Sequence, residues 1–107
     1  HDRLMGYVSH LPQLTASALM DVIGSATDAD GLALAGRGLV DTTRLASSPP
    51  STWVDICAVN ADVLDGALET LIARLTELRA DLRQGAVIHR TFDAAARWRA
   101  ELMKDRE

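Results

Sequence analysis

The sequence predicts an all-α protein, a helical bundle with one long helix, and two observations support this class. The chain of 107 residues is 48% apolar but only 4% aromatic, and it is rich in Ala and Leu, which favour helices. Apolar residues also recur at spacings of three and four, the period of an amphipathic helix. The length is that of one domain, residues 1–107.

The first helix is expected to begin after Asp2, which can cap its N-terminus. An apolar stripe follows, made of Leu4, Val8, Leu11, Thr15, Ala18, Leu19 and Val22. Pro12 lies inside this pattern, so a kink is expected there that leaves the carbonyl of Val8 without its helical partner. Gly24 and Ser25 are expected to end the helix.

A short helix is predicted next, capped by Thr27 with Asp30 three residues later and ended by Gly36. Between residues 36 and 53 the helical pattern stops, and glycine, Asp, Thr and Arg residues crowd together. Thr and Asp side chains tend to bond neighbouring backbone groups rather than continue a helix. This stretch is therefore predicted to be a loop.

Ser48 and Pro49 are expected to open the long helix, which should run unbroken from about residue 53 to residue 84 and stop at Gly85. Its apolar stripe consists of Val59, Val63, Leu64, Leu68, Leu71, Ile72, Leu75, Leu78 and Leu82. The last helix is predicted over residues 87–104. The apolar residues expected on its core face are Ile88, Phe92, Ala95, Trp98 and Leu102.

A helix over residues 53–84 would be about 50 Å long, whereas a compact domain of this size has a diameter of roughly 34 Å. One copy of the chain could not cover such a helix along its whole length. The apolar stripe therefore predicts a homodimer related by a two-fold axis.

Arg44, His10 and Trp53 are the candidate functional residues, and each has a structural alternative. Arg44 offers a rigid fork of donors that suits a carboxylate, but composition alone favours a structural pair with Asp41. His10 could be a hydrogen-bonded core or surface histidine. Trp53 could be a packing anchor or a ligand contact.

Two blocks of residues resemble the C-terminal helical dimerisation domain of the prephenate dehydrogenase and arogenate dehydrogenase family. The first block comprises His1, Asp2 and Arg3, followed by Ser9, His10, Leu11 and Pro12. The second comprises Gly38, Asp41, Thr43, Arg44 and Ala46, followed by Trp53, Asp55, Ile56 and Asn60. The blocks keep the family's order, and the likeness covers essentially the whole chain.

The resemblance implies a parent enzyme that oxidises prephenate with NAD and releases carbon dioxide, giving 4-hydroxyphenylpyruvate for tyrosine synthesis. Arogenate and NADP are the alternative substrate and cofactor. In the family, an N-terminal nucleotide-binding domain holds the cofactor and the catalytic histidine; both are absent from this chain, which starts at His1 rather than Met and is expected to be part of a longer protein. The family's helical domain forms an intertwined homodimer.

The resemblance also assigns substrate-binding residues. Arg44 would hold a substrate carboxylate, Asp41 would orient Arg44 or close the pocket, and Gly38 would let the backbone approach the ligand. Ser9 and His10 would line the opposite wall. Trp53 matches a tryptophan near the family's substrate pocket, and Gln13 stands where the family usually has a second histidine. Gln13 can hydrogen-bond a polar ligand but cannot take up a proton.

Other functions are disfavoured by composition. The net charge is −4 and the 11 Lys and Arg residues form no dense run, so no nucleic-acid partner is expected. No apolar run is long enough for a bilayer, and the single Cys57 fits a reducing cytoplasm. Neither a metal site nor a catalytic group that acts unaided is predicted.

Two alternatives from other classes stay open at this level. A free-standing helical dimerisation module without catalysis would explain the apolar stripe, but not the segment from Gly38 to Arg44. A small all-helical chorismate mutase would need several Arg and Lys side chains converging inside the bundle. The basic residues of the long helix instead alternate with acidic ones, as on a solvated face.

Overall fold

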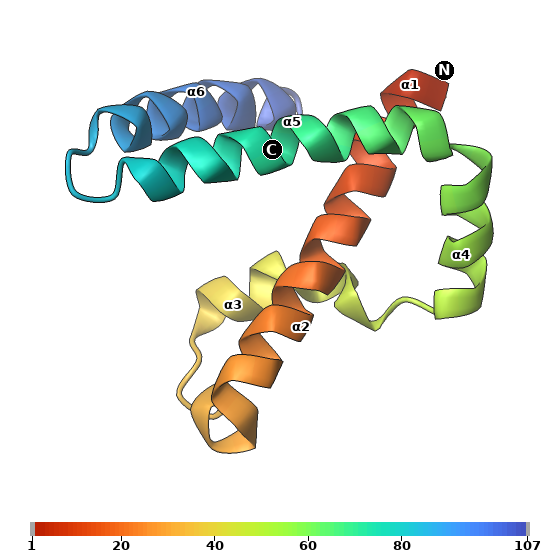
Figure 1. Cartoon of the computed structure of the whole chain (residues 1–107), viewed down its shortest axis with the longest axis horizontal. Helices are drawn as coiled ribbons and strands as arrows, with labels where there is room; N and C mark the ends of the chain where they lie inside the picture. The colour runs from red at the N-terminus through yellow and green to blue at the C-terminus, as the bar shows by residue number, and fades with distance from the viewer. Residues whose placement is uncertain (1, 107) are drawn as a thin grey trace. The chain divides into compact units, whose positions relative to one another are not determined.

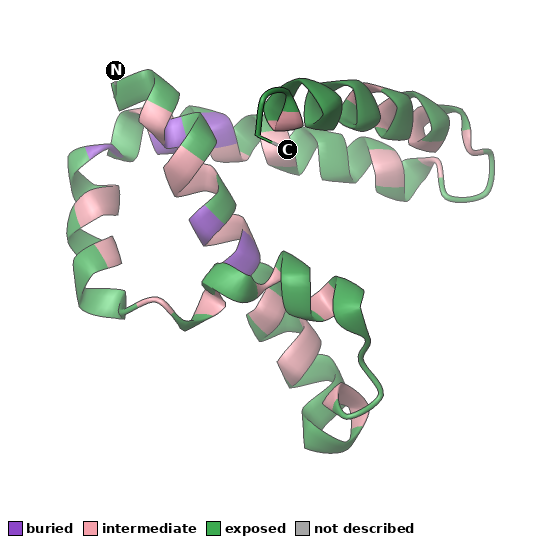
Figure 2. Cartoon of the chain, turned by 180° about the vertical axis from the view of Figure 1, so that it is seen from behind, coloured by how far each residue is buried: buried purple, intermediate pink, exposed green. Residues whose placement is uncertain are grey.

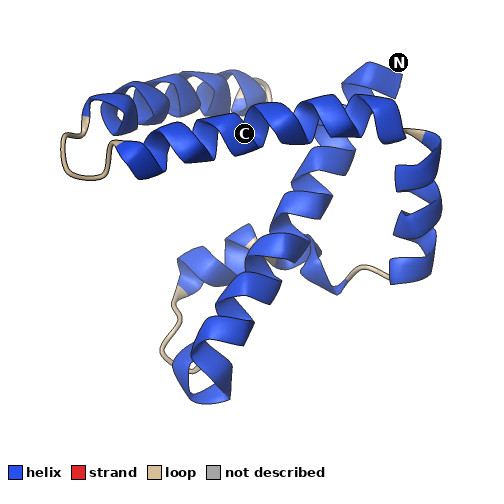
Figure 3. Ribbon diagram, viewed as in Figure 1, coloured by secondary structure: helices blue, strands red, loops and turns tan. Residues whose placement is uncertain are grey.

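The computed structural model describes residues 2–106, and all regular structure in that range is helical (Figure 3). The elements in chain order are α1 (Asp2–Met5), the π-helical turn η1 (Gly6–His10), α2 (Leu11–Leu32), α3 (Arg37–Thr42), the 3-10 helix η2 (Arg44–Ser47), α4 (Pro50–Val59), α5 (Ala61–Ala80) and α6 (Ala86–Met103) (Figure 1). The predicted all-α class is confirmed. His1, part of the first family block, lies outside the described residues.

The chain forms two compact units, residues 1–68 and residues 69–107. The first unit holds the elements from α1 to α4 and the beginning of α5. The second is a hairpin in which the remainder of α5 runs antiparallel to α6 (Figure 1). All the predicted site residues belong to the first unit.

Pro12 is accommodated by a change of helix type just before it. Proline has no N–H, and its ring crowds the carbonyl four residues earlier. The turn η1 is π-helical, and the N–H of Leu11 donates to the carbonyl of Gly6, five residues back. The helix thus passes the proline through a wider turn, which carries Ser9 and His10 at its end.

The first long helix continues past Gly24 and Ser25, so its predicted end is wrong. The break comes at Asp28, which has a positive φ of 57°. The Asp28 carboxylate accepts hydrogen bonds from the N–H groups of Asp30 and Gly31, at 3.0 and 3.3 Å. Asp28 rather than Thr27 therefore caps the following turn.

The segment predicted as a loop after residue 36 is helical up to Ser47, as α3 and η2. The hydroxyls of Thr42 and Thr43 donate to the carbonyls of Gly38 and Leu39, each at 2.7 Å. These bonds reach back four residues, so both hydroxyls are satisfied by the last turn of α3 and do not prevent that helix from forming. The loop prediction is wrong for this reason.

The predicted unbroken helix over residues 53–84 is wrong as well. Pro49 occupies the N-cap position of α4 and Pro50 is its first residue, one position later than expected. The helix then breaks at Asn60, whose φ of −110° and ψ of 27° separate α4 from α5. The 20 residues of α5 span only about 30 Å. Helix length therefore gives no argument for a dimer.

The exposure of apolar side chains gives an argument for a dimer instead. The only buried apolar residues in the described range are Ala16, Leu64 and Ala67, all in the first unit (Figure 2). No residue from 69 to 106 is buried. Phe92 and Trp98, expected in the core, are 70% and 72% exposed. Nearly half of the sequence is apolar, yet within the described range Leu64 is the only large apolar side chain that is buried, and many others are exposed in one copy.

Each unit has one local contact that sets its geometry, a tight packing contact at Gly6 in the first and hydrogen bonds from Asp81 in the second. Gly6 is buried, and a Cβ there would lie 2.6 Å from Cγ1 of Val63 on α5, so η1 and α5 can approach closely only with glycine. In the hairpin, the Asp81 carboxylate accepts from the N–H groups of Val87 and Ile88, at 2.6 and 3.1 Å. Asp81 thereby satisfies the exposed donors at the start of α6.

Candidate functional site

Gln13 is the most tightly held of the predicted site residues. It lies on α2 and is only 5% exposed. Its Nε2 donates to the Leu45 carbonyl at 2.7 Å and to the Ser17 hydroxyl at 3.1 Å, while its Oε1 accepts from the Ser48 hydroxyl at 3.1 Å. The Gln13 amide thus pins η2 and the residue after it onto α2.

Arg44 opens the segment that Gln13 holds. Its side chain is exposed, and no described residue forms an ion pair or hydrogen bond with it. The alternative in which Arg44 pairs with Asp41 is not what the structure shows, because Asp41 pairs with Arg37 one turn earlier, with Nε and Oδ2 3.8 Å apart. A guanidinium anchored at its backbone and free at its tip is suited to bind an external carboxylate.

Asp41 and Gly38 lie on α3, next to this arginine. The Arg37–Asp41 pair is strongly exposed, and such pairs contribute little to stability. A Cβ at Gly38 would meet nothing within 4 Å, and glycine costs about 1 kcal/mol in a helix. The described part of the chain therefore gives no packing reason for glycine at this position.

His10 and Trp53 meet face to edge, their ring centroids 5.8 Å apart and their planes at 81°. His10 ends η1, Trp53 lies in the first turns of α4, and both are half-buried. The edge-to-face contact is a favourable arrangement of aromatic rings. Ser9 precedes His10 in the π-helical turn and is also half-buried.

Asn60 joins this group, and it was not among the predicted site residues. Its side chain is within 3.2 Å of Nδ1 of His10, and the residue is 8% exposed. A hollow of about 330 Å³ is lined here by Asp2, His10, Asp55, Ile56, Val59 and Asn60. Two sequence signals pointed to it: Asn60 belongs to the second family block, and Asn is a poor residue for the interior of a long helix.

The structure thus places the predicted residues in two groups on the first unit. One group contains Gln13 and the free Arg44, and the other contains His10 and Trp53. No cluster of three or more His, Cys, Asp or Glu side chains within residues 2–106 could hold a metal ion. In the same range, no helix has both the length and the apolarity needed to cross a bilayer.

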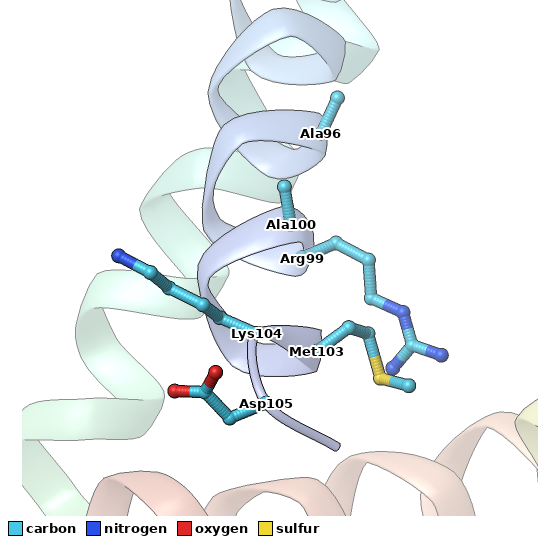
Figure 4. Close-up of a pocket in the computed structure, with 6 residues that line it drawn as sticks. All are labelled: Ala96, Arg99, Ala100, Met103, Lys104 and Asp105. Atoms are coloured by element: carbon cyan, nitrogen blue, oxygen red, sulfur yellow. The ribbon is translucent and has the colours of Figure 1, made fainter. Parts of the chain in front are cut away.

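A second hollow, of about 610 Å³, lies at the C-terminal end of α6 (Figure 4). Its lining consists of Ala96, Arg99, Ala100, Met103, Lys104 and Asp105. Figure 4 shows Arg99 and Met103 projecting to one side of the helix, and Lys104 and Asp105 to the other. None of the predicted site residues lines this hollow, so it is not a candidate for the predicted site.

Comparison with protein families gives a match to "prephenate dehydrogenase, dimerization domain" over residues 1–93. The chain belongs to this family. The matched range includes every residue of the two groups described above and ends before the hollow of Figure 4.

Two curated relatives agree with this assignment. A cyclohexadienyl dehydrogenase of Zymomonas mobilis is 28% identical over 112 aligned residues, which cover 100% of this chain and 38% of the relative. A prephenate dehydrogenase of Bacillus subtilis is 29% identical over 86 residues, covering 78% of this chain and 23% of the relative. The chain therefore corresponds to well under half the length of either dehydrogenase.

Replacing Gln13 tests its role within the dimerization domain. Gln13→Ala removes three hydrogen bonds and leaves the Leu45 carbonyl without this donor. We expect the free energy of unfolding to fall by about 1–3 kcal/mol, measured by chemical denaturation of the full chain. The matched control is Gln84→Ala at the chain's other, exposed glutamine, which should change the value by less than about 0.5 kcal/mol. Equal effects of the two variants would contradict the role given to Gln13.

Proposed function

We propose that the chain is the dimerisation and substrate-binding part of a dehydrogenase that converts prephenate to 4-hydroxyphenylpyruvate, with loss of carbon dioxide and reduction of NAD. Arogenate and NADP are the alternative substrate and cofactor. Both relatives are dehydrogenases, one named for cyclohexadienyl compounds and the other for prephenate, which supports a dehydrogenase acting on this type of compound. The proposed setting is the cytoplasm.

Arg44 carries this proposal. Prephenate and arogenate both bear carboxylates, and an arginine without an internal partner can bind one through two parallel charge-assisted hydrogen bonds. Gln13 fixes the segment that bears Arg44, which lowers the entropy lost when a ligand is bound. In this proposal Gln13 positions the binding segment, because its own amide is already engaged.

The remaining predicted residues complete the site. His10 and Ser9 contribute polar groups from η1, and Trp53 supports the imidazole ring and offers apolar surface to the substrate. Gly38 leaves room for a ligand or a second copy of the chain to approach α3. Asp41 is proposed to close the pocket, since its present contact with Arg37 is weak and exposed.

The cofactor is proposed to bind a part of the protein outside this chain. A dinucleotide site of the usual kind needs a strand followed by a glycine-rich turn and a helix. Residues 2–106 contain no strand. Gly36 and Gly38 flank the start of a helix of only six residues. The described residues therefore do not fit NAD or NADP, and no step of hydride transfer is assigned to them.

A homodimer is proposed from the uncovered apolar side chains of the hairpin. Those exposed by more than half are Ile72, Leu75, Leu82, Phe92, Trp98 and Leu102. A hollow of about 500 Å³ between α5 and α6 is lined partly by Leu71, Leu75, Leu78, Val87 and Trp98. Covering such a surface is favourable by about 25 cal/mol per Å², and a second copy presents the same surface in return.

The test is an assay of the intact protein with prephenate or arogenate, each combined with NAD or NADP. We expect formation of the reduced cofactor together with release of carbon dioxide in at least one combination. Absence of both products in all four, in a folded protein that binds neither substrate, would favour a dimerisation module without catalysis. Chorismate mutase activity is not expected, because no Arg or Lys is buried among residues 2–106.

A further inference from the structure

Asn60 interrupts the helical path of the chain and directs its side chain into the first unit. It separates α4 from α5 and is buried. Its Nδ2 donates to the backbone carbonyl of Asp2 at 3.0 Å and lies 3.2 Å from Nδ1 of His10. A break between helices, a buried amide and two contacts far away in sequence thus occur at one residue.

The Asp2 carbonyl determines which way the Asn60 amide points. A backbone carbonyl only accepts hydrogen bonds, so the NH₂ group and not the oxygen of Asn60 must face it. The same NH₂ group has a second hydrogen, and this one is directed at Nδ1 of His10. Because the amide nitrogen only donates, Nδ1 must accept.

This contact selects one tautomer of the neutral imidazole. A neutral ring carries a single hydrogen, so when Nδ1 accepts, the hydrogen is on Nε2. The edge-to-face contact with Trp53 restrains the plane of the same ring. His10 therefore has a fixed plane and a fixed donor atom before any ligand arrives.

We propose that Asn60 is a positioning residue that holds His10 as an Nε2–H donor to an uncharged oxygen of the substrate, a hydroxyl or a carbonyl. This rests on the proposed function. The oxygen is uncharged because Asp2 and Asp55 line the same hollow as His10, and their carboxylates disfavour an anionic group there. In this proposal the substrate carboxylate binds to Arg44.

The tautomer can be measured without any ligand, from the ¹⁵N chemical shifts of the imidazole nitrogens in the full chain under conditions that keep the rings neutral. His10 should carry its hydrogen on Nε2. His89 is an internal reference, because its Nδ1 lies 3.3 Å from the Asp93 carboxylate, which only accepts and favours hydrogen on Nδ1. His10 with its hydrogen on Nδ1 in the unaltered chain would overturn the proposal.

Asn60→Asp supplies the discriminating variant, because it replaces the donor by an acceptor of nearly the same shape. The His10 hydrogen should move to Nδ1, whereas the His89 signals should stay unchanged. Asn60→Ala should give a mixture of tautomers. A purely structural Asn60 would lower stability but leave the His10 tautomer as in the unaltered chain. That result would overturn the proposal, and if neither variant folds, the unaltered chain alone decides.

The substrate step is tested in the intact enzyme with a double-mutant cycle. Asn60→Ala and His10→Ala should each raise KM about tenfold, and the double variant should raise it no further. Additive effects would show that Asn60 does not act through His10. A failure of this proposal can be told apart from a failure of the proposed function. The tautomer is measured without substrate, and the assay of the unaltered enzyme does not involve Asn60.

Discussion

Arg44→Ala is expected to raise the KM for prephenate or arogenate about 10- to 100-fold in the intact enzyme. The guanidinium is free of internal partners in the described part of the chain, so its donors are available to a carboxylate. A hydrogen bond to a charged group contributes about 1.5–3 kcal/mol, and each 1.4 kcal/mol is a factor of ten in affinity. Steady-state kinetics with varied substrate concentration measures the change.

Arg37→Ala is the matched control for this variant. Arg37 is an exposed arginine on neighbouring α3, and its contact with Asp41 is a weak surface pair. The control should change KM by less than about threefold, and neither substitution should shift the midpoint of thermal unfolding appreciably. A KM that does not change in Arg44→Ala would refute the carboxylate-binding role, because no other role within residues 2–106 is visible for this side chain.

Trp98→Glu is expected to raise the dissociation constant of the proposed homodimer about 30- to 1000-fold. Trp98 is 72% exposed in a single copy and lines the hollow between α5 and α6. Aromatic anchors of this kind contribute about 2–4 kcal/mol or more to an interface. Burying a carboxylate in the same place adds a desolvation cost. Analytical ultracentrifugation over a range of concentrations measures the dissociation constant.

Arg97→Glu is the control for the dimer experiment. It introduces the same acidic side chain at the neighbouring position of α6, where the native residue is already charged and exposed. We expect a much smaller change in the dissociation constant, of about threefold or less. If Trp98→Glu stays dimeric at the concentrations at which the unaltered chain is dimeric, the hairpin surface is not the interface.

The helical class was predictable from sequence because composition and apolar period are local properties that each helix shows on its own. The positions of the helix breaks were not. At both breaks, Asp28 and Asn60, a side chain makes hydrogen bonds to the backbone. The bond from Asn60 reaches a partner 58 residues away in sequence, which no apolar pattern can reveal.

The candidate site divides in the same way. The family blocks around His10 and Arg44 were visible in the sequence, because the residue types and spacings are specific. The roles of Gln13 and Asn60 were not, since a glutamine suited to a ligand and a glutamine engaged with the backbone look alike in sequence. Only the contacts of Gln13 with Leu45 and Ser48 distinguish them.

The sequence by itself determined the all-α class and the family, and it named the candidate residues for binding a carboxylate, because all three depend on residue types at short spacings. The tertiary structure decided which of these residues are free to bind. Within residues 2–106 it shows no ion pair or side-chain hydrogen bond for Arg44, an Asn60 amide directed at His10 and an apolar hairpin whose large side chains stay exposed in one copy. These properties depend on which residues far apart in sequence come into contact when the chain folds. Residue types at short spacings do not specify those contacts.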